Sequence, residues 1–178
     1  DGYKCWVPIS DVLGVAFHRE AWKPILLNPT EIRNRLPNIL SWIEKASMRI
    51  NKYLWGGTIG PDFDCSGLIQ TAFASEEIWL PRDAYQQEDF CEKVQWEVNT
   101  CQGILPGDLI FFGTNQKCNH VGIYKGNGSY WHSSGKINGC NGIGMSSLIE
   151  KDAISAFYLS KIRSVGRVIS CHDGTSMP

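Results

Sequence analysis

The chain has 178 residues, 43% of them hydrophobic and 20% charged, a composition typical of a globular domain and not of a disordered segment. It holds 17 lysines and arginines against 18 aspartates and glutamates, for a formal net charge of -1. This balance argues against nucleic acid and anionic membranes as partners. Because no apolar run approaches the roughly 20 residues of a membrane-spanning helix, no membrane span is predicted.

Two features bear on the compartment. Residues 1–4 lack the apolar core and the small-residue cleavage site of a signal peptide, which favours the cytoplasm over an exported location without deciding between them. Seven cysteines are present, and no two are spaced as CxxC, so the usual zinc and thioredoxin signatures are absent. We expect most of the cysteines to be small buried residues, although seven of them would allow up to three disulfides in an exported protein.

Residues 1–35 differ from the rest of the chain. Their short apolar stretches are broken by prolines and glycines, as in strands and turns, and the segment is too short to be stable alone. A helix is predicted over residues 36–50, where apolar side chains recur at helical spacing, with Pro37 in its first turn. A second helix is predicted to begin close to Cys65, and a short third one after the start signal at residues 80–83.

In the second half of the chain the apolar residues change from helical spacing to the alternation typical of strands. A stretch of small and turn-forming residues at 126–128 is a hairpin signal between two of these segments. Helices followed by an antiparallel sheet indicate an α+β fold. The predicted strands cover residues 107–112, 120–125, 129–132, 156–159 and 165–169.

Cys65 is the candidate nucleophile. The thiolate is the attacking species, and a free thiol has a pKa of about 8.5. A helix N-terminus and a nearby imidazolium both lower that pKa, and a helix is predicted to begin at Cys65. The small neighbours Ser66 and Gly67 leave room for a substrate carbonyl, and the backbone N–H groups of the helix start could hold an oxyanion. From helix position alone, a buried cysteine without a catalytic role explains the sequence equally well.

Two of the four histidines lie on the predicted hairpin, and its loop length decides whether they share a face of the sheet. A two-residue loop would place His132 opposite Ile123, on the face away from His120. A three-residue loop at residues 126–128 would place His132 opposite Gly122, on the same face as His120. In that case His120 could take the thiol proton while His132 fixes its tautomer. Taken alone, either histidine is more simply a surface residue of a strand.

Five stretches, in order and over roughly residues 38–160, resemble the NlpC-type, papain-like family of cell-wall cysteine peptidases. The resemblance implies a reduced papain-like fold, with helices packed on a small antiparallel sheet. Residues 1–35 would be the C-terminal part of an SH3-like barrel plus a linker, and residues 36–178 the catalytic domain. The matching stretches are Tyr53–Gly57, Asp62–Leu68, Leu80–Asp83, Pro106–Phe112 and His120–Tyr124 running on to His132–Ser134.

The resemblance also implies roles for three residues: Cys65 as nucleophile, His120 as base and His132 as the third polar residue. It implies no metal and no organic cofactor. The implied reaction is hydrolysis of the amide between the γ-carboxyl of D-glutamate and a diamino acid in the stem peptides of peptidoglycan. Which diamino acid is accepted, and the oligomeric state, are left open.

Two further stretches resemble the subgroup that carries an N-terminal bacterial SH3 domain, namely Arg82-Asp83 and Asp64-Cys65-Ser66. Enzymes of that subgroup bind the free amine of an N-terminal L-alanine in the substrate. Where that subgroup can have a further hydroxyl, this chain has Ala84. Alternatives are open: Asp64 also suits a helix N-cap, and the two aromatic candidates also suit the core. The candidate substrate-binding residues are Tyr53, Trp55, Asp64, Ser66, Arg82 and Asp83.

Two other functions are compatible with parts of the sequence. A papain-like amidase or acyltransferase acting on another amide would keep the cysteine and histidine, but it should carry an apolar tail-binding segment near them, and none is visible. A non-catalytic wall-binding module would depend on the SH3-like segment. The presence of Cys65, His120 and His132 together argues against that module.

Overall fold

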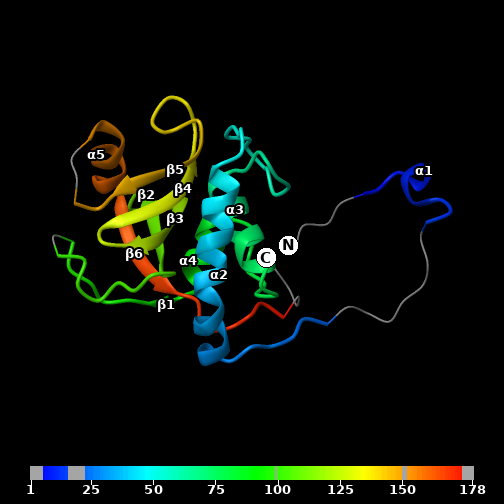
Figure 1. Ribbon diagram of the computed structural model, residues 1–178, viewed down its shortest axis with the longest axis horizontal. Helices are drawn as coiled ribbons and strands as arrows, with labels where there is room; N and C mark the ends of the chain where they lie inside the picture. The colour runs from blue at the N-terminus through cyan, green and yellow to red at the C-terminus, as the bar shows by residue number, and fades with distance from the viewer. Residues whose placement is uncertain (1–5, 16–22, 99, 150–151, 174–178) are drawn as a thin grey trace.

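The computed structural model describes residues 6–15, 23–98, 100–149 and 152–173. Six strands pair antiparallel in one sheet of order β1-β6-β2-β3-β4-β5. Figure 1 shows α2 and α3 side by side against this sheet and α5 apart from them, so the predicted α+β fold is confirmed. The strands are β1 Glu92–Lys93, β2 Leu109–Gly113, β3 Cys118–Gly126, β4 Ser129–Ser134, β5 Gly142–Ser147 and β6 Ile162–Arg167, and the helices are α1 Ile9–Val12, α2 Pro29–Ser47, α3 Cys65–Ala74, α4 Ala84–Phe90 and α5 Ala153–Leu159.

The sheet is covered on both faces. Along β2, Leu109 and Phe111 belong to the apolar cluster that contains the buried residues of α2 and α3. Ile110 and Phe112, on the other face, belong to a second cluster with Tyr158 of α5. Alternate side chains of a strand point to opposite faces, which explains the nearly continuous apolar run of β2. The sheet therefore separates the layer of α3 from the layer of α5.

Helix α2 begins earlier than its apolar stripe indicates. The Asn28 side chain caps it by accepting two backbone N–H bonds, and Glu31 Oε2 accepts the Asn28 N–H at 2.8 Å. This reciprocal capping box, with Pro29 at the first helical position, fixes the start. The predicted start near residue 36 is therefore wrong, and Pro37 lies inside the helix. The predicted end is also wrong, because the helix stops at Ser47 and Ile50 is 93% exposed.

Residues 156–159, predicted as a strand, belong to helix α5 instead. The Asp152 side chain accepts the backbone N–H bonds of Ile154 and Ser155 and so starts the helix. A short apolar run fits either a buried strand or a helix, and the cap decides here. The predicted strands at 107–112, 120–125, 129–132 and 165–169 correspond to β2, β3, β4 and β6 with shifted ends.

The segment before α2 shows no strand in its described part. Residues 6–15 contain the four-residue helix α1, which buries no residue, and residues 23–28 contain no regular element. The predicted domain boundary at residue 36 falls inside α2. The rest of the expected SH3-like segment, residues 1–5 and 16–22, lies outside the described residues.

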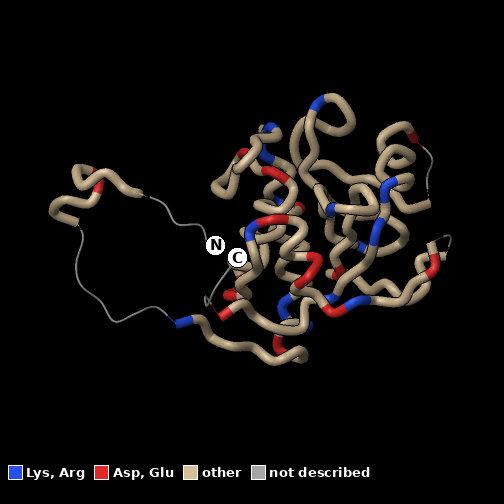
Figure 2. Tube along the Cα trace, turned by 180° about the vertical axis from the view of Figure 1, so that it is seen from behind, with Lys and Arg blue, Asp and Glu red and all other residues tan. Residues whose placement is uncertain are grey.

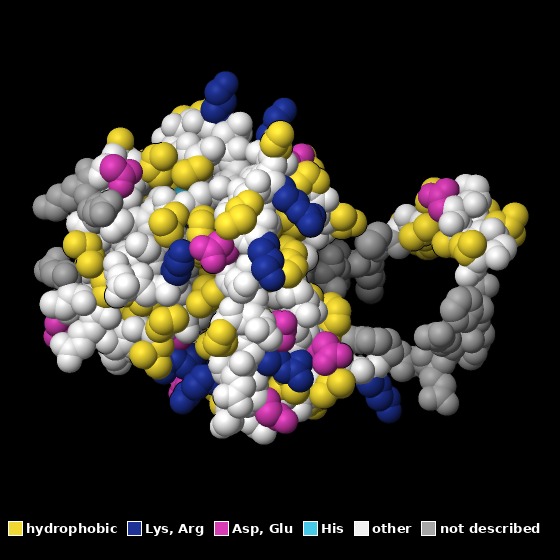
Figure 3. All heavy atoms as spheres, viewed as in Figure 1, with side chains coloured by type: hydrophobic (Ala, Val, Ile, Leu, Met, Phe, Trp, Pro, Cys, Tyr) yellow, Lys and Arg dark blue, Asp and Glu magenta, His cyan; other side chains and the backbone are white. Residues whose placement is uncertain are grey.

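The surface carries no concentration of one charge along the described chain. Figure 2 shows lysines and arginines interspersed with aspartates and glutamates, and in Figure 3 the hydrophobic side chains of the viewed face are scattered among polar ones. No helix in the described part of the chain is long and apolar enough to cross a membrane. The six described cysteines are free, and all of them except Cys140 are buried; Cys5 lies outside the described residues.

Candidate active site

Cys65 is the first residue of α3, as predicted, because Asp64 caps the helix. Asp64 Oδ1 accepts the backbone N–H of Gly67 at 2.7 Å, and Oδ2 accepts the N–H of Gly56 at 2.8 Å. The cap satisfies a backbone donor that would otherwise have no partner at the helix start. One carboxylate thus ties the preceding loop to the helix and fixes where the thiol is presented.

Arg82 holds the same carboxylate from the other side. Its guanidinium donates to Asp64 Oδ1 at 3.1 Å and to Oδ2 at 2.6 Å, and it also donates to the hydroxyl oxygen of Ser66 at 3.0 Å. All three residues are buried, and a two-pronged arginine–carboxylate pair is geometrically rigid. Arg82 and Asp64 therefore position Cys65, and a substrate ammonium at Asp64 would have to share it with the guanidinium.

The sulfur of Cys65 lies against β3. Burial and, to a lesser extent, the charge of Asp64 raise the pKa of the thiol to about 11, against the opposing hydrogen bond from the backbone of Val121. The helix start was expected to lower the pKa of this thiol, but burial and the charge of Asp64 outweigh that effect. Val121 directly follows His120 in the chain, so the thiol and the imidazole belong to the same end of β3. No hydrogen bond between Cys65 and His120 occurs among the described contacts, and such catalytic bonds commonly tighten when a substrate binds.

The two histidines meet as predicted. His120 Nε2 and His132 Nδ1 are 2.8 Å apart, and His132 Nε2 lies 3.0 Å from the hydroxyl of Ser146 on β5. When His132 donates its Nε2 proton to Ser146, its Nδ1 accepts the proton of His120 Nε2. This arrangement leaves a lone pair on His120 Nδ1 for a proton donor. Sequence reasoning missed Ser146, which is buried at the end of this chain of hydrogen bonds.

The hairpin has the turn of the predicted two-residue loop, but it places His132 on the face predicted for the three-residue loop. Gly126 pairs with Ser129, so the turn has two residues, and both Asn127 and Gly128 have positive φ, at 51° and 76°, as type I′ turns require. A bulge at Lys125 then adds one residue to β3. The bulge shifts the pairing by one position, and His132 returns to the face of His120.

Aromatic rings enclose the histidine pair. The Tyr158 ring of α5 stacks on His120 with centroids 4.5 Å apart and meets His132 edge-on at 4.8 Å. Phe112 lies 5.7 Å from His120. Burial holds the pKa of His120 well below its usual value, with His132 adding to the effect, and burial lowers that of His132 to about 4. Tyr158 was also missed, because its segment was predicted as a strand.

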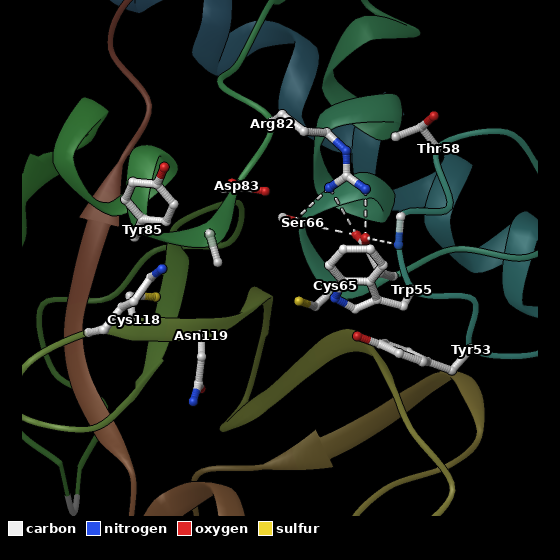
Figure 4. Close-up of a pocket in the computed structure, with 14 residues that line it drawn as sticks. Tyr53, Trp55, Thr58, Cys65, Ser66, Arg82, Asp83, Tyr85, Cys118 and Asn119 are labelled. Atoms are coloured by element: carbon white, nitrogen blue, oxygen red, sulfur yellow. Dashed lines mark hydrogen bonds and ion pairs between the residues drawn. The ribbon is translucent and has the colours of Figure 1, made fainter. Parts of the chain in front are cut away.

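A cavity of about 520 Å³ opens at Cys65. In Figure 4 the sulfur lies between the Trp55 and Tyr53 rings on one side and Tyr85, Cys118 and Asn119 on the other. Trp55 is 87% exposed, so the alternative that it packs in the core is wrong, and Tyr53 is half-buried at the rim. All six predicted substrate-binding residues line this cavity: Tyr53, Trp55, Asp64, Ser66, Arg82 and Asp83.

Asp83 differs from Asp64 in its surroundings. It is half-buried and precedes α4, where its backbone N–H donates to Gln86 Oε1 at 3.0 Å. It lines the cavity, as does Lys117, whose ammonium lies 4.7 Å from the centre of the Tyr85 ring. The cavity thus combines aromatic walls with charges of both signs. No group of three or more potential metal ligands occurs among the described residues.

Two known proteins with related sequences are peptidases by name. The chain is 37% identical over 121 residues to the bifunctional muramidase/DL-endopeptidase CwlT of Bacillus subtilis. The aligned region covers 65% of this chain and 32% of that protein. It is 39% identical over 84 residues to the γ-D-glutamyl-L-lysine dipeptidyl-peptidase of Bacillus cereus, covering 46% of this chain and 24% of that protein. The chain therefore spans a third or less of the length of these relatives.

Solved structures agree with the fold. An NlpC/P60 family protein from Bacillus cereus superposes with a TM-score of 0.59 at 26% identity, over 80% of this chain and 41% of that one. The peptidoglycan hydrolase RipB of Mycobacterium tuberculosis superposes with a TM-score of 0.55 at 25% identity, over 80% of this chain and 73% of that one. The profile of the NlpC/P60 family matches residues 50–162, a range that contains Cys65, His120 and His132, and the chain belongs to the NlpC/P60 family.

Proposed function

We propose that this protein is a cysteine endopeptidase that hydrolyses the bond between γ-D-glutamate and a diamino acid in peptidoglycan stem peptides. One observation carries the proposal: the thiol at the start of α3 lies against Val121 of β3, and the preceding residue of that strand, His120, belongs to a buried histidine pair with an Nε2–Nδ1 separation of 2.8 Å. Relatives named DL-endopeptidase and γ-D-glutamyl-L-lysine dipeptidyl-peptidase support this class of bond.

The chemistry follows from the positions of these groups. The pKa of the thiol is raised to about 11, so the proton rests on sulfur at neutral pH and a base must remove it. His120 takes this proton at Nδ1, and the sulfur attacks the γ-carbonyl carbon while backbone N–H groups at the start of α3 face the oxyanion. The C–N bond then breaks, and the imidazolium returns its proton to the leaving amine. Water, activated by His120, hydrolyses the thioester and frees Cys65.

The acyl side of the substrate would occupy the cavity at Cys65. A free N-terminal L-alanine amine carries a positive charge, and Asp64 and Asp83 are the two carboxylates that line this cavity. Asp64 is buried and Arg82 engages both of its oxygens, whereas Asp83 caps α4 with its side chain but is only half-buried, so Asp83 is the more accessible partner for that ammonium. Trp55 and Tyr53 would cover the short peptide from one side. A requirement for a free N-terminal amine is therefore part of the proposal.

The proposal is tested with the synthetic tripeptide L-Ala-γ-D-Glu-diamino acid and its N-acetylated form. The wild-type protein should release L-Ala-γ-D-Glu from the free tripeptide, and the Cys65→Ala variant should release none. Acetylation removes the charge that Asp83 would recognise and should lower kcat/KM about tenfold or more. Asp83→Asn should lower kcat/KM for the free tripeptide and leave less difference between the two substrates.

Matched controls separate the competing functions. Ser160→Ala changes an exposed hydroxyl after α5 and should cleave like the wild type. Undiminished cleavage by Cys65→Ala would exclude Cys65 as the nucleophile. Absence of cleavage by the wild type together with retained binding to purified peptidoglycan would favour a wall-binding module, and cleavage of an unrelated amide alone would favour an amidase.

A further inference from the structure

Ser146 completes a row of three polar side chains that crosses three neighbouring strands. Its hydroxyl on β5 lies 3.0 Å from His132 Nε2 on β4, and His132 Nδ1 lies 2.8 Å from His120 Nε2 on β3. None of the three residues is more than 8% exposed. Buried polar groups take their partners from the protein where water does not reach them, so the protons in this row have few possible positions.

The pairing of β4 with β5 brings the serine to the histidine. Ser146 lies opposite Tyr130, and His132 lies opposite Gly144. Alternate residues of a strand share a face, so Tyr130, His132 and Ser146 point to one side of the sheet. The hydroxyl then reaches the imidazole diagonally across the two strands. The sheet, and not a loop, therefore fixes the distance between Ser146 and the ring.

Two proton arrangements satisfy these contacts while both rings are uncharged, the state that their lowered pKa values favour at neutral pH. In the first, His120 donates to His132 and His132 donates to Ser146, which leaves a lone pair on His120 Nδ1. In the second, Ser146 donates to His132 and His132 donates to His120, which leaves a proton on His120 Nδ1. Only the first arrangement allows His120 to take the thiol proton of Cys65.

The proposed reaction removes this choice as soon as His120 becomes charged. An imidazolium donates from both of its ring nitrogens, so His132 Nδ1 must accept from His120, and the proton of His132 must be on Nε2. The Ser146 hydroxyl lies within hydrogen-bond reach of that buried N–H. A buried donor without an acceptor is costly, and without Ser146 this cost would arise when the charge forms.

We propose that Ser146 is a positioning residue, which accepts the Nε2 proton of His132 and so keeps Nδ1 of His120 open as the base. This inference rests on the proposed function and deepens it. Ser146 acts through His132, and it is not among the residues that line the cavity at Cys65. Because its hydrogen bond matters most in the charged state, its loss should lower kcat more than it changes KM.

The variant Ser146→Ala tests this role by steady-state kinetics on the free tripeptide. One buried hydrogen bond that is lost in the charged state is worth about tenfold in rate, so we expect kcat to fall about tenfold, with KM changed less than about twofold. Ser146→Thr keeps a hydroxyl and should recover most of the loss. The matched control is Ser147→Ala, which should keep kcat within about twofold of the wild type.

Ser147 suits this control because it is the next residue of the same strand and is also buried. Its side chain points to the opposite face of the sheet, where its hydroxyl accepts the backbone N–H of Ile149 at 3.0 Å. The control therefore removes a buried hydroxyl from β5 without touching the histidines.

The tautomer of His132 provides a second measurement, which needs no activity. In nitrogen-15-labelled wild-type protein at pH 7, NMR should find the His132 proton on Nε2, and Ser146→Ala should shift it towards Nδ1. A wild-type proton on Nδ1, or a kcat of Ser146→Ala equal to that of the wild type, would overturn the inference while leaving the peptidase intact. A wild type that cleaves no tripeptide would overturn the proposed function, and the tautomer would still decide whether Ser146 accepts this proton.

Discussion

His120 and His132 lie on neighbouring strands of one hairpin, with Nε2 and Nδ1 2.8 Å apart and both side chains buried. The contact orients His120 so that its other ring nitrogen remains available, and it requires the bulge in β3 that restores the register. Tyr158 of α5 packs on both rings. A base buried in this way is fixed in orientation, and its pKa is lowered by the same burial.

Replacing His132 should affect turnover more than binding. His132→Ala removes the acceptor that fixes the tautomer of His120, and we expect kcat to fall about 100-fold with KM changed less than threefold. His132→Asn supplies an amide oxygen as acceptor and should retain more kcat than the alanine variant. Steady-state kinetics on the free tripeptide measure both values. A rise in KM with kcat unchanged would show that His132 contacts the substrate instead.

The pH dependence of cleavage should reflect the burial of His120. Its pKa is held well below 6.5 by burial and by His132, so the base stays unprotonated as the pH falls through 6. A histidine with the ordinary pKa of about 6.5 would lose roughly tenfold in kcat/KM between pH 7.5 and 5.5. We expect a clearly smaller loss over that range. An acid limb centred at or above pH 6.5 would contradict the assignment.

The free energy of unfolding should decrease as the pH falls from about 6.5 to about 4, because of the buried His132. Burial lowers its pKa in the folded state to about 4, while the unfolded chain has the ordinary value of about 6.5. Between these values only the unfolded state binds this proton, so His132 alone lowers the free energy of unfolding by about 1.4 kcal/mol per pH unit as the pH falls, and above pH 6.5 it adds no dependence. His120, whose pKa is also held well below 6.5, adds to this slope. Urea unfolding at pH 7, 6 and 5 measures the slope, which His132→Gln should reduce.

An unreduced slope in His132→Gln would show that other groups cause the acid sensitivity. Comparing slopes, not absolute stabilities, keeps the packing cost of the substitution out of the result.

The buried pair of Arg82 and Asp64 should be costly to break. Arg82→Met leaves the Asp64 carboxylate buried without its countercharge, and we expect a loss of about 3–5 kcal/mol in the free energy of unfolding. Adding Asp64→Asn should cost less than the sum of the two single changes, because the partners interact directly. The control Arg35→Met breaks the more exposed pair with Glu77 and should cost about 1 kcal/mol or less. Equal losses for Arg82→Met and Arg35→Met would refute a structural role for the buried pair.

Gly67 should not tolerate a side chain. A Cβ at this position would lie 2.0 Å from the backbone oxygen of Gly57 and 2.9 Å from Asp64 Oδ1, so the backbone must shift. We expect Gly67→Ala to cost about 1–3 kcal/mol and also to lower kcat, since the same shift displaces Cys65. Unfolding and kinetic measurements on one preparation test both effects. Normal stability and turnover would mean that the loop yields without moving the thiol.

Local chemistry in the sequence determined the elements that carry the candidate nucleophile and base. The start of α3 at Cys65 follows from Asp64 as a cap and from the small residues after it, all within one helical turn. The strands around His120 and His132 follow from alternation of apolar residues. The start of α2 is also encoded locally, by Asn28, Pro29 and Glu31, upstream of the apolar stripe that indicates a later start.

Tertiary packing decided the rest. Whether His132 faces His120 depends on the bulge at Lys125, and α5 covers both rings only because residues 153–159 form a helix. Arg82 reaches Asp64 from 18 residues along the chain, and Ser146 reaches His132 from 14 residues away. Caps and periodicity act over about four residues, so the sequence displays them directly. Strand register, ring stacking and buried ion pairs depend on contacts between segments that are distant in the sequence. They therefore form only when the chain folds as a whole.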